Sequence, residues 1–235
     1  MEHFKPSSAL IVGAGGGLSA SLARAFARDG LKVSLAARNT DKLADLCAET
    51  GAIAFQCDAG DVQQVKALFA NLDRGPGAPD VVVYNPSYRA RGAFIEIDPV
   101  EIEKSLRITA FGGFLVAQEA ARRMLAKGAG VILFTGASAS VKGYAQSAPF
   151  AMGKFALRGL AQSMARELQP KGIHVCHVNI DGGIRNEARG YVERSGEPDS
   201  FLDPDAIAQT YLHLINQHRS AWTFELELRP WLERF

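Results

Sequence analysis

The sequence has little of the features that mark several large classes of protein. Its three cysteines stand far apart among 235 residues, which argues against a disulfide framework or a cysteine-based metal cage, so we expect no metal. A formal net charge of only +1 gives no long-range attraction to nucleic acid or to an anionic membrane. No run approaches the ~20 apolar residues that span a bilayer, and residues 1–6 lack the apolar stretch of a secretory signal. We therefore expect a cytoplasmic protein whose partner is a small molecule.

What the sequence does contain is a regular alternation of short apolar runs and longer helical patterns. The strand-like runs are Ala9–Val12, Lys32–Ala36, Ala52–Cys57, Val81–Tyr84, Val131–Thr135, His174–Val178 and Thr223–Leu228. The helical stretches are Ser19–Arg28, Thr40–Thr50, Val62–Leu72, Pro99–Ala126, Ser147–Gln169 and Pro204–Asn216. Strands that alternate with helices require parallel crossovers. The pattern therefore predicts an α/β fold with a doubly wound parallel sheet of about seven strands, in a single domain over residues 1–235.

A glycine cluster follows the first predicted strand and precedes the first predicted helix. It contains Gly13 and Gly17, and Leu18 and Ser19 lead from it into the helix. Residues without a side chain let the backbone bend sharply and approach a diphosphate, which the N-terminus of a helix attracts. A plain tight turn is the alternative, but the position after the first strand of a βαβ unit favours a dinucleotide site.

A second motif lies in the long helix near residue 150, where Phe150 stands four residues before Lys154. Together with the glycine cluster, it resembles the Gly-x-x-x-Gly-x-Gly and Tyr-x-x-x-Lys motifs of the short-chain dehydrogenase/reductase family. Ser19 then stands in place of the third glycine, and Phe150 in place of the catalytic tyrosine. The sequence resembles a divergent branch of this family, with that same Phe-for-Tyr change, over nearly its whole length. The resemblance implies a Rossmann-like fold, an NAD(P)-dependent oxidoreductase acting on a small carbonyl or alcohol, and a homodimer or homotetramer.

The resemblance also implies which residues bind the cofactor. At the end of the second strand, Ala37 offers no carboxylate and Arg38 is the nearest charge, which favours NADP, with NAD as the other option. A solvated arginine is the alternative reading of Arg38. Asp61, in the loop after the third strand, is more simply a helix N-cap. The other implied cofactor contacts are Asp58 and Ala59 after the third strand, Asn85 after the fourth, and Gly182, Ile184 and Asn186 after the sixth.

Most of the family's catalytic positions are altered in this chain. A phenyl ring has no ionisable proton, so Phe150 cannot act as a general acid or base. Thr109 stands in the place of the family's asparagine, and Ala137 in the place of its serine, with Ser138 one residue beyond. Lys154 is kept, and because burying an unpaired lysine is costly, we expect it still to hold the nicotinamide ribose. An ordinary surface lysine is the alternative.

Another hydroxyl could replace the one that is missing. Tyr144 lies in the loop after the fifth strand, between Ser138 and Lys154, and is a better candidate than Tyr88. A tyrosine that packs over the cleft with its hydroxyl in water is the alternative. Asp181 is either a turn residue or a proton-handling group. The segment over residues 187–202 is either a mobile lid or an ordinary surface loop.

Two functions therefore remain open at this stage. The first is an oxidoreductase with Lys154, Ser138 and Tyr144 at its site. The second is a catalytically inactive protein that binds a dinucleotide or a metabolite and acts in sensing or assembly. Aromatic residues within 229–235, at the end of the sequence, suggest contact with a partner subunit.

Overall fold

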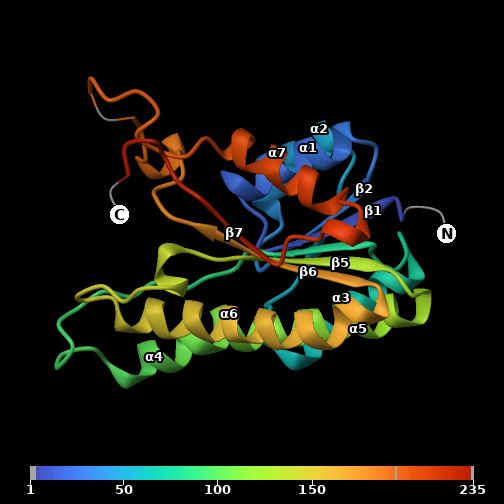
Figure 1. The fold of residues 1–235 in the computed structure, drawn as a ribbon, viewed down its shortest axis with the longest axis horizontal. Coiled ribbons are helices and arrows are strands. Elements are labelled where there is room, and N and C mark those ends of the chain that lie inside the picture. The colour runs from blue at the N-terminus through green and yellow to red at the C-terminus, as the bar shows by residue number, and fades with distance from the viewer. Residues whose placement is uncertain (1–3, 194, 234–235) are drawn as a thin grey trace.

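The computed structural model describes residues 4–193 and 195–233, and these form one parallel sheet between two layers of helices (Figure 1). In spatial order the strands are β3 (Ile53–Gln56), β2 (Lys32–Ala37), β1 (Ser8–Val12), β4 (Val81–Tyr84), β5 (Gly130–Thr135), β6 (Ile173–Ile180) and β7 (Glu225–Leu228). The order reverses direction between β1 and β4, as in a doubly wound sheet. The predicted fold class is confirmed. The outer limits of the domain, 1 and 235, lie outside the described residues and stay a prediction.

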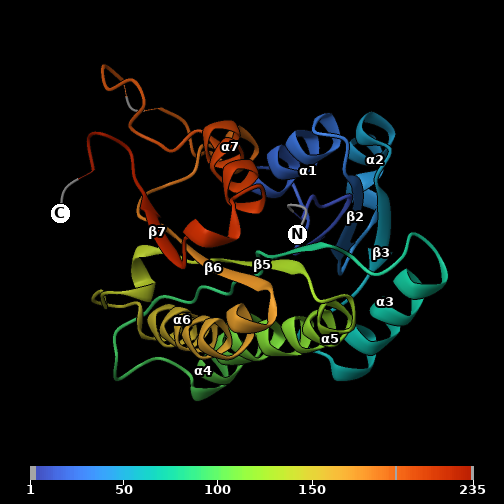
Figure 2. The same cartoon turned by 45° about the vertical axis from the view of Figure 1, so that its right-hand side comes forward.

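The helices divide between the two faces of the sheet, as Figures 1 and 2 show. One layer consists of α1 (Leu18–Arg28), α2 (Ala44–Thr50) and α7 (Pro204–Ile215). The other consists of α3 (Val62–Arg74), α4 (Pro99–Leu106), α5 (Gly112–Lys127) and α6 (Ala148–Leu168). Because both faces are covered, the central strands are apolar throughout rather than alternating. In the described part of the chain, no helix has the length and apolarity to cross a membrane.

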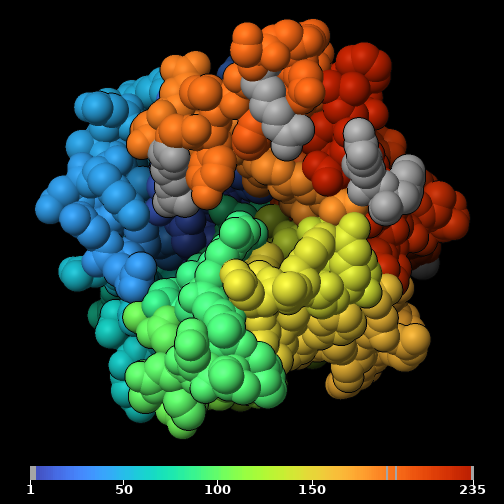
Figure 3. All heavy atoms as spheres, turned by 90° about the vertical axis from the view of Figure 1, so that its left-hand side faces the viewer, coloured from blue at the N-terminus to red at the C-terminus, as the bar shows by residue number. Residues whose placement is uncertain are grey.

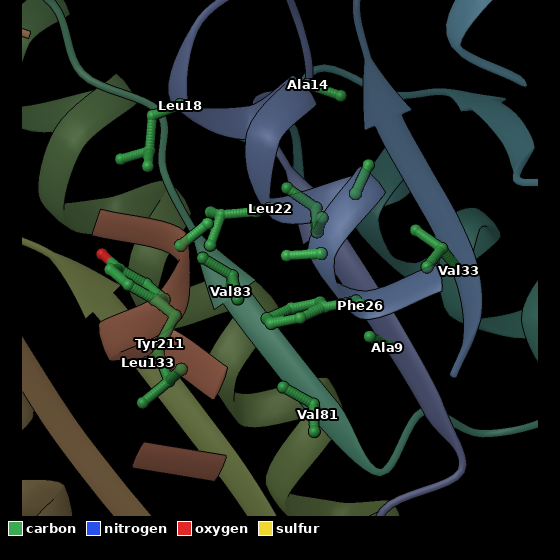
Figure 4. Close-up of a cluster of buried hydrophobic side chains, with 14 of the residues drawn as sticks. Ala9, Ala14, Leu18, Leu22, Phe26, Val33, Val81, Val83, Leu133 and Tyr211 are labelled. Atoms are coloured by element: carbon green, nitrogen blue, oxygen red, sulfur yellow. The ribbon is translucent and has the colours of Figure 1, made fainter. Parts of the chain in front are cut away.

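One of the two hydrophobic cores lies directly under the glycine turn. Leu22 and Phe26 of α1 pack against β4 and against Tyr211 of α7, and Ala14 and Leu18 extend this cluster into the turn itself (Figure 4). All five side chains are buried. Full burial of a leucine or phenylalanine contributes about 1.5–3 kcal/mol. The turn is therefore held from below by the core, whatever binds above it.

The predicted helical stretch Pro99–Ala126 is helical throughout, but its middle is not α-helical. A π-helical turn over Arg107–Phe111 separates α4 from α5. The hydroxyl of Tyr84, at the end of β4, donates to the carbonyl of Ile108 at 2.5 Å and so stabilises the wider turn. A π-turn adds one residue to the helix and re-aims its neighbours, often at functional sites. Here the turn places Thr109 in the protein interior.

Candidate active site

The loops that follow the strands gather at one end of the sheet, where α/β folds bind their ligands. Seen from that end, the molecule is hollowed between the segment after β6, in orange, and the segments after β4 and β5, in green and yellow (Figure 3). All the catalytic residues named from the sequence lie on the segments around this hollow, or on the helix turns beside it. We call this hollow the cleft.

The glycine turn is shaped by close approach to two other loops. Gly13 has φ +81°, and a Cβ atom there would lie 2.8 Å from Pro86. Gly17 also has φ +81°, and a Cβ atom there would lie 2.7 Å from the amide nitrogen of Asn186. Both positions thus require glycine for conformation as well as for space. The contacts bring the loops after β4 and β6 against the turn, as a shared ligand site requires.

The outer face of the turn, by contrast, is open. A Cβ atom on Gly16 would meet nothing within 4 Å, and one on Gly15 would meet only the ammonium of Lys42, at 3.9 Å. The first turn of α1, which begins just beyond, holds no acidic side chain. A free helix N-terminus, bare backbone and a nearby cation form a cradle that fits a diphosphate. The residues present therefore fit a dinucleotide.

Ser19, in the place of the family's third glycine, connects two loops. Its side chain is 2 % exposed, donates to the carbonyl of Gly13 at 3.1 Å and accepts from the side-chain amide of Asn85 at 2.7 Å. The backbone N–H of Asn85 donates in turn to Val12 at 3.1 Å. A hydroxyl has one proton, and Ser19 donates it to the carbonyl of Gly13. The serine therefore stabilises the turn and has no proton left to donate to a ligand.

The other residues predicted to contact the cofactor have the following surroundings, and their role in binding stays a prediction. Leu18 is the first residue of α1 and has its side chain in the core, so only its backbone is left for a ligand. One carboxylate oxygen of Asp58 accepts from Gly60 at 2.9 Å, and Ala59 is buried beside it. Asp61 accepts from two N–H groups of α3, which confirms its reading as an N-cap.

Two cations stand where the second strand ends. Arg38 is exposed and belongs to none of the ion pairs formed by the described residues. Lys42 follows on the short turn Asp41–Leu43. Sequence reasoning missed Lys42, because nothing in the local pattern shows that its ammonium returns to Gly15.

Lys154 is buried at the base of the cleft, only 3 % exposed. Its ammonium donates to the carbonyl of Thr135, at the end of β5, at 2.7 Å. Desolvation, and then the charge of Arg89, lowers the pKa of Lys154 from 10.5 to about 7. An ammonium has three donors, so two remain for a ligand. The reading of Lys154 as a surface lysine is wrong.

Phe150 is covered by an arginine that sequence reasoning missed. The ring is 7 % exposed; the guanidinium carbon of Arg89 lies 4.2 Å from its centroid, and the ammonium of Lys154 lies 6.0 Å from it. Such distances are those of cation–π contacts. Two cations therefore meet at the position where the family carries its proton donor. The only sequence signal was the basic pair Arg89 and Arg91 after Asn85.

The predicted hydroxyl groups differ in their surroundings. Thr109 is fully buried, and its hydroxyl oxygen accepts from the N–H of Tyr88 at 3.2 Å. Ser138 is half-buried and begins the short turn Ser138–Ser140. Tyr144 is 46 % exposed, and its ring contact is with the ammonium of Lys142, at 5.6 Å.

The hydroxyl of Tyr88 is engaged away from the cleft. It donates to Glu101 at 2.7 Å and accepts from Lys104 at 2.9 Å, both on α4. The structure thus brings Phe150 and Lys154 together, but it places Tyr144 and Tyr88 in contact with other groups.

The loop after β6 borders the cleft opposite the segments after β4 and β5 (Figure 3). Gly182 has φ +151° and packs against Pro230. Ile184 pairs with Leu202, and Asn186 pairs with Tyr191, so the segment over residues 187–202 is tied at its base by two β-bridges.

Asp181 is 3 % exposed and ion-paired with Arg229 at 2.6 Å, with Lys142 at 3.7 Å. A buried carboxylate held by an arginine has a structural role, and both roles predicted for Asp181 stay predictions.

With the geometry in place, comparison with known proteins identifies the family. A family model described as short chain dehydrogenase matches residues 7–190. Versicolorin reductase 1 of Aspergillus parasiticus is 32 % identical over 203 residues, which cover 83 % of this chain and 77 % of that protein. The cyclic-di-GMP-binding biofilm dispersal mediator protein of Escherichia coli is 30 % identical over 189 residues, covering 80 % of this chain and 77 % of that protein.

Solved structures agree. A short-chain dehydrogenase from Rhodopseudomonas palustris is 36 % identical and superposes with a TM-score of 0.83, over 96 % of this chain and 99 % of that one. The chain belongs to the short-chain dehydrogenase family. This confirms the predicted family, and with it the class of NAD(P)-dependent oxidoreductases that acts on small molecules.

Proposed function

We propose that this protein is an NADP(H)-dependent oxidoreductase that interconverts a small carbonyl compound and its alcohol, with an active site built around Lys154 rather than a tyrosine. The observation that carries the proposal is the burial of Lys154 without an acidic partner at the base of the cleft. A buried ammonium with only one carbonyl partner is destabilising, so its retention indicates a ligand that compensates it.

The cofactor would lie across the carboxyl ends of the strands. Its diphosphate fits the open face of the glycine turn, and the second carboxylate oxygen of Asp58 is available to the adenine. Arg38 and Lys42 supply the positive charge that a 2′-phosphate needs, which favours NADP over NAD. Contacts at the nicotinamide end fall to Ile184 and Asn186, and ribose contacts to the two free donors of Lys154. When bound, the cofactor supplies or accepts a hydride.

The chain itself must handle the proton and the charge on oxygen. A carbonyl that gains a hydride becomes an alkoxide, which needs a donor and then a proton. Lys154, with its pKa near 7, can give up a proton at neutral pH, as an ordinary lysine cannot. The hydroxyl of Ser138, at the rim of the cleft, can orient the substrate oxygen. Phe150 keeps water from the site but contributes no proton.

We further propose that the chain forms a homodimer through α5 and α6, and a homotetramer by a second contact. Phe111, the last residue of the π-helical turn, and Phe114 of α5 stack on each other and are 42 % and 41 % exposed. Phe155 of α6 is 44 % exposed. Such an apolar surface is typical of an interface. The cytoplasmic location expected from the sequence stays a prediction.

Absorbance of NADPH, followed while a panel of aldehydes and ketones is added, tests the proposal. Turnover by the natural protein, lost in Lys154→Met and kept in Lys66→Met, supports it. Lys66 is an exposed lysine of α3 and so controls for the loss of one charge. Binding of NADPH without turnover of any carbonyl would favour the sensing or assembly role instead.

A further inference from the structure

The substrate end of the cleft carries more positive charge than the protein itself balances. Arg89 and Arg91 are exposed residues of the loop between β4 and α4, and Lys154 is buried on α6, near the ring of Phe150 on which Arg89 stacks. Among residues 4–193 and 195–233, none of the ion pairs includes any of these three cations.

Asp181, Asp203 and Glu193, three acids of the segments after β6, have partners of their own. Asp181 is paired with Arg229, and Asp203 with Arg185. Glu193 accepts from the N–H and the hydroxyl of Ser200, at 2.8 and 2.9 Å. These carboxylates are therefore paired with groups other than Arg89, although the second oxygen of Glu193 has only the guanidinium of Arg185 near it, at 3.8 Å, and no hydrogen bond.

The loop that carries Arg89 is fixed on both sides. Tyr88, just before it, is anchored to α4 and to Thr109 by its hydroxyl and its N–H. Beyond it, the N–H of Gly92 donates to the carbonyl of Gln146 at 3.2 Å, which ties the loop to the segment after β5. A guanidinium held on a fastened loop, and stacked on a buried ring, is set in place before a ligand arrives.

From this arrangement we propose that the substrate is an anion, a carbonyl or alcohol that bears a carboxylate or a phosphate, and that Arg89 binds the charged group. The proposal rests on the proposed function for the identity of the site. The guanidinium is planar, and its parallel N–H groups match the two oxygens of a carboxylate or phosphate. Its stacking on Phe150 places that charge beside the residue where a hydride acceptor would sit.

The proposal also explains why phenylalanine suits position 150. A tyrosine hydroxyl at the ring edge would compete for the neighbouring cations, whereas a phenyl ring offers its face to Arg89 and no acceptor. Desolvation, and then the charge of Arg91, lower the pKa of Arg89, as expected where like charges meet without an acid.

Calorimetric titration with matched pairs of ligands tests the proposal, with and without saturating NADP. One pair is acetoacetate and methyl acetoacetate; the other is dihydroxyacetone phosphate and dihydroxyacetone. The two pairs separate carboxylate from phosphate recognition. In the natural protein we expect one of the two anions to bind at least about tenfold more tightly than its neutral counterpart.

Variants assign the effect to Arg89. In Arg89→Met the preference for the anion is expected to vanish, in Arg89→Lys to persist in part, and in Arg74→Met, which changes an exposed arginine at the end of α3, to remain whole. NADPH affinity should stay within about twofold in all three, since Arg89 lies at the substrate end.

Equal binding of anion and neutral counterpart, no binding of either anion at about 10 mM, or an unchanged preference in Arg89→Met each overturns the proposal. Failure of the proposed function is a separate result. It shows as a lack of NADPH binding by the natural protein, while the titrations without NADP still report on Arg89.

Discussion

The two ends of the cleft differ in whether their polar side chains have partners within the protein. At the glycine end, the polar side chains are satisfied by one another: Ser19 donates to Gly13 and accepts from Asn85, and Asp61, after β3, caps α3. Only backbone N–H groups at the start of α1 stay open there. At the substrate end, Lys154 has one carbonyl partner, and Arg89 has the face of a phenyl ring. At one end the polar side chains have their partners without a ligand, and at the other end they do not.

The difference teaches where the specificity of this protein resides. A turn whose shape is fixed by backbone bonds and core packing can receive the part of a ligand that all members of the family share. Lys154 and Arg89, which have no acidic partner in the described part of the chain, can instead bind a ligand particular to this protein. Phe150 lies at the end that lacks counter-charges.

The largest effect should come from the turn, where Gly13→Ala is expected to lower the free energy of unfolding by about 3–4 kcal/mol. Alanine is strained at the positive φ of this position, and its Cβ would also clash with Pro86. Gly30→Ala is the matched control, since Gly30 has φ +90° but nothing within 4 Å, and we expect about 1 kcal/mol there. Urea denaturation measures both. Equal losses in the two variants would show that the close contact with Pro86 is unimportant.

The second effect concerns the incomplete end and depends on pH. The folded-state pKa of Lys154 is about 7 and its ordinary value is 10.5, so between these values the unfolded chain holds a proton that the folded chain lacks. The cost of burying the ammonium is present in full below pH 7 and is relieved as the pH rises towards 10.5.

Lys154→Met, measured without cofactor, removes that cost. Its stability advantage over the natural protein should therefore shrink by about 3 kcal/mol between about pH 6 and about pH 9.5. Lys66→Met should show no such change. If the difference in free energy of unfolding between the two proteins is constant across this range, Lys154 keeps an ordinary pKa. The charge at the substrate end would then be compensated by the protein itself.

A smaller effect is expected when the family's glycine is restored at the turn. Ser19→Gly removes two hydrogen bonds and leaves the amide of Asn85 without its partner, at a cost of about 1–2 kcal/mol. NADPH affinity should change little, because the hydroxyl points inward. If stability is unchanged while NADPH affinity falls tenfold, the serine contacts the cofactor after all, and the turn is less self-contained than described.

The smallest effect should come from Tyr144→Phe, with turnover within about twofold of the natural protein. The ring is half in solvent and lies against Lys142, so its hydroxyl is not placed beside Lys154. Loss of most turnover in this variant, with NADPH binding intact, would instead make Tyr144 the replacement for the missing tyrosine.

The sheet and the retained lysine were predictable because their signals are local. Apolar runs with turn residues between them predict the seven strands, and the spacing of Phe150 and Lys154 places both on one helix. The π-turn at Thr109 was not predictable, because it depends on the hydroxyl of Tyr84, far away in the sequence.

The two missed cations have the same explanation. Lys42 and Arg89 look like ordinary surface residues in sequence, and only tertiary packing brings one to Gly15 and the other onto Phe150. Ser19 was recognised as a departure from the motif, but its inward bonds require Asn85 and could not be read from the turn alone.

The claim on which the account depends is that Lys154 still holds a dinucleotide, and NADPH fluorescence titration tests it most directly. The natural protein should bind NADPH, Lys66→Met should bind it equally well, and Lys154→Met should bind it at least about tenfold more weakly, since the ribose loses its charged donors. Equal affinity in Lys154→Met, or no binding of NADPH by the natural protein, would contradict the account.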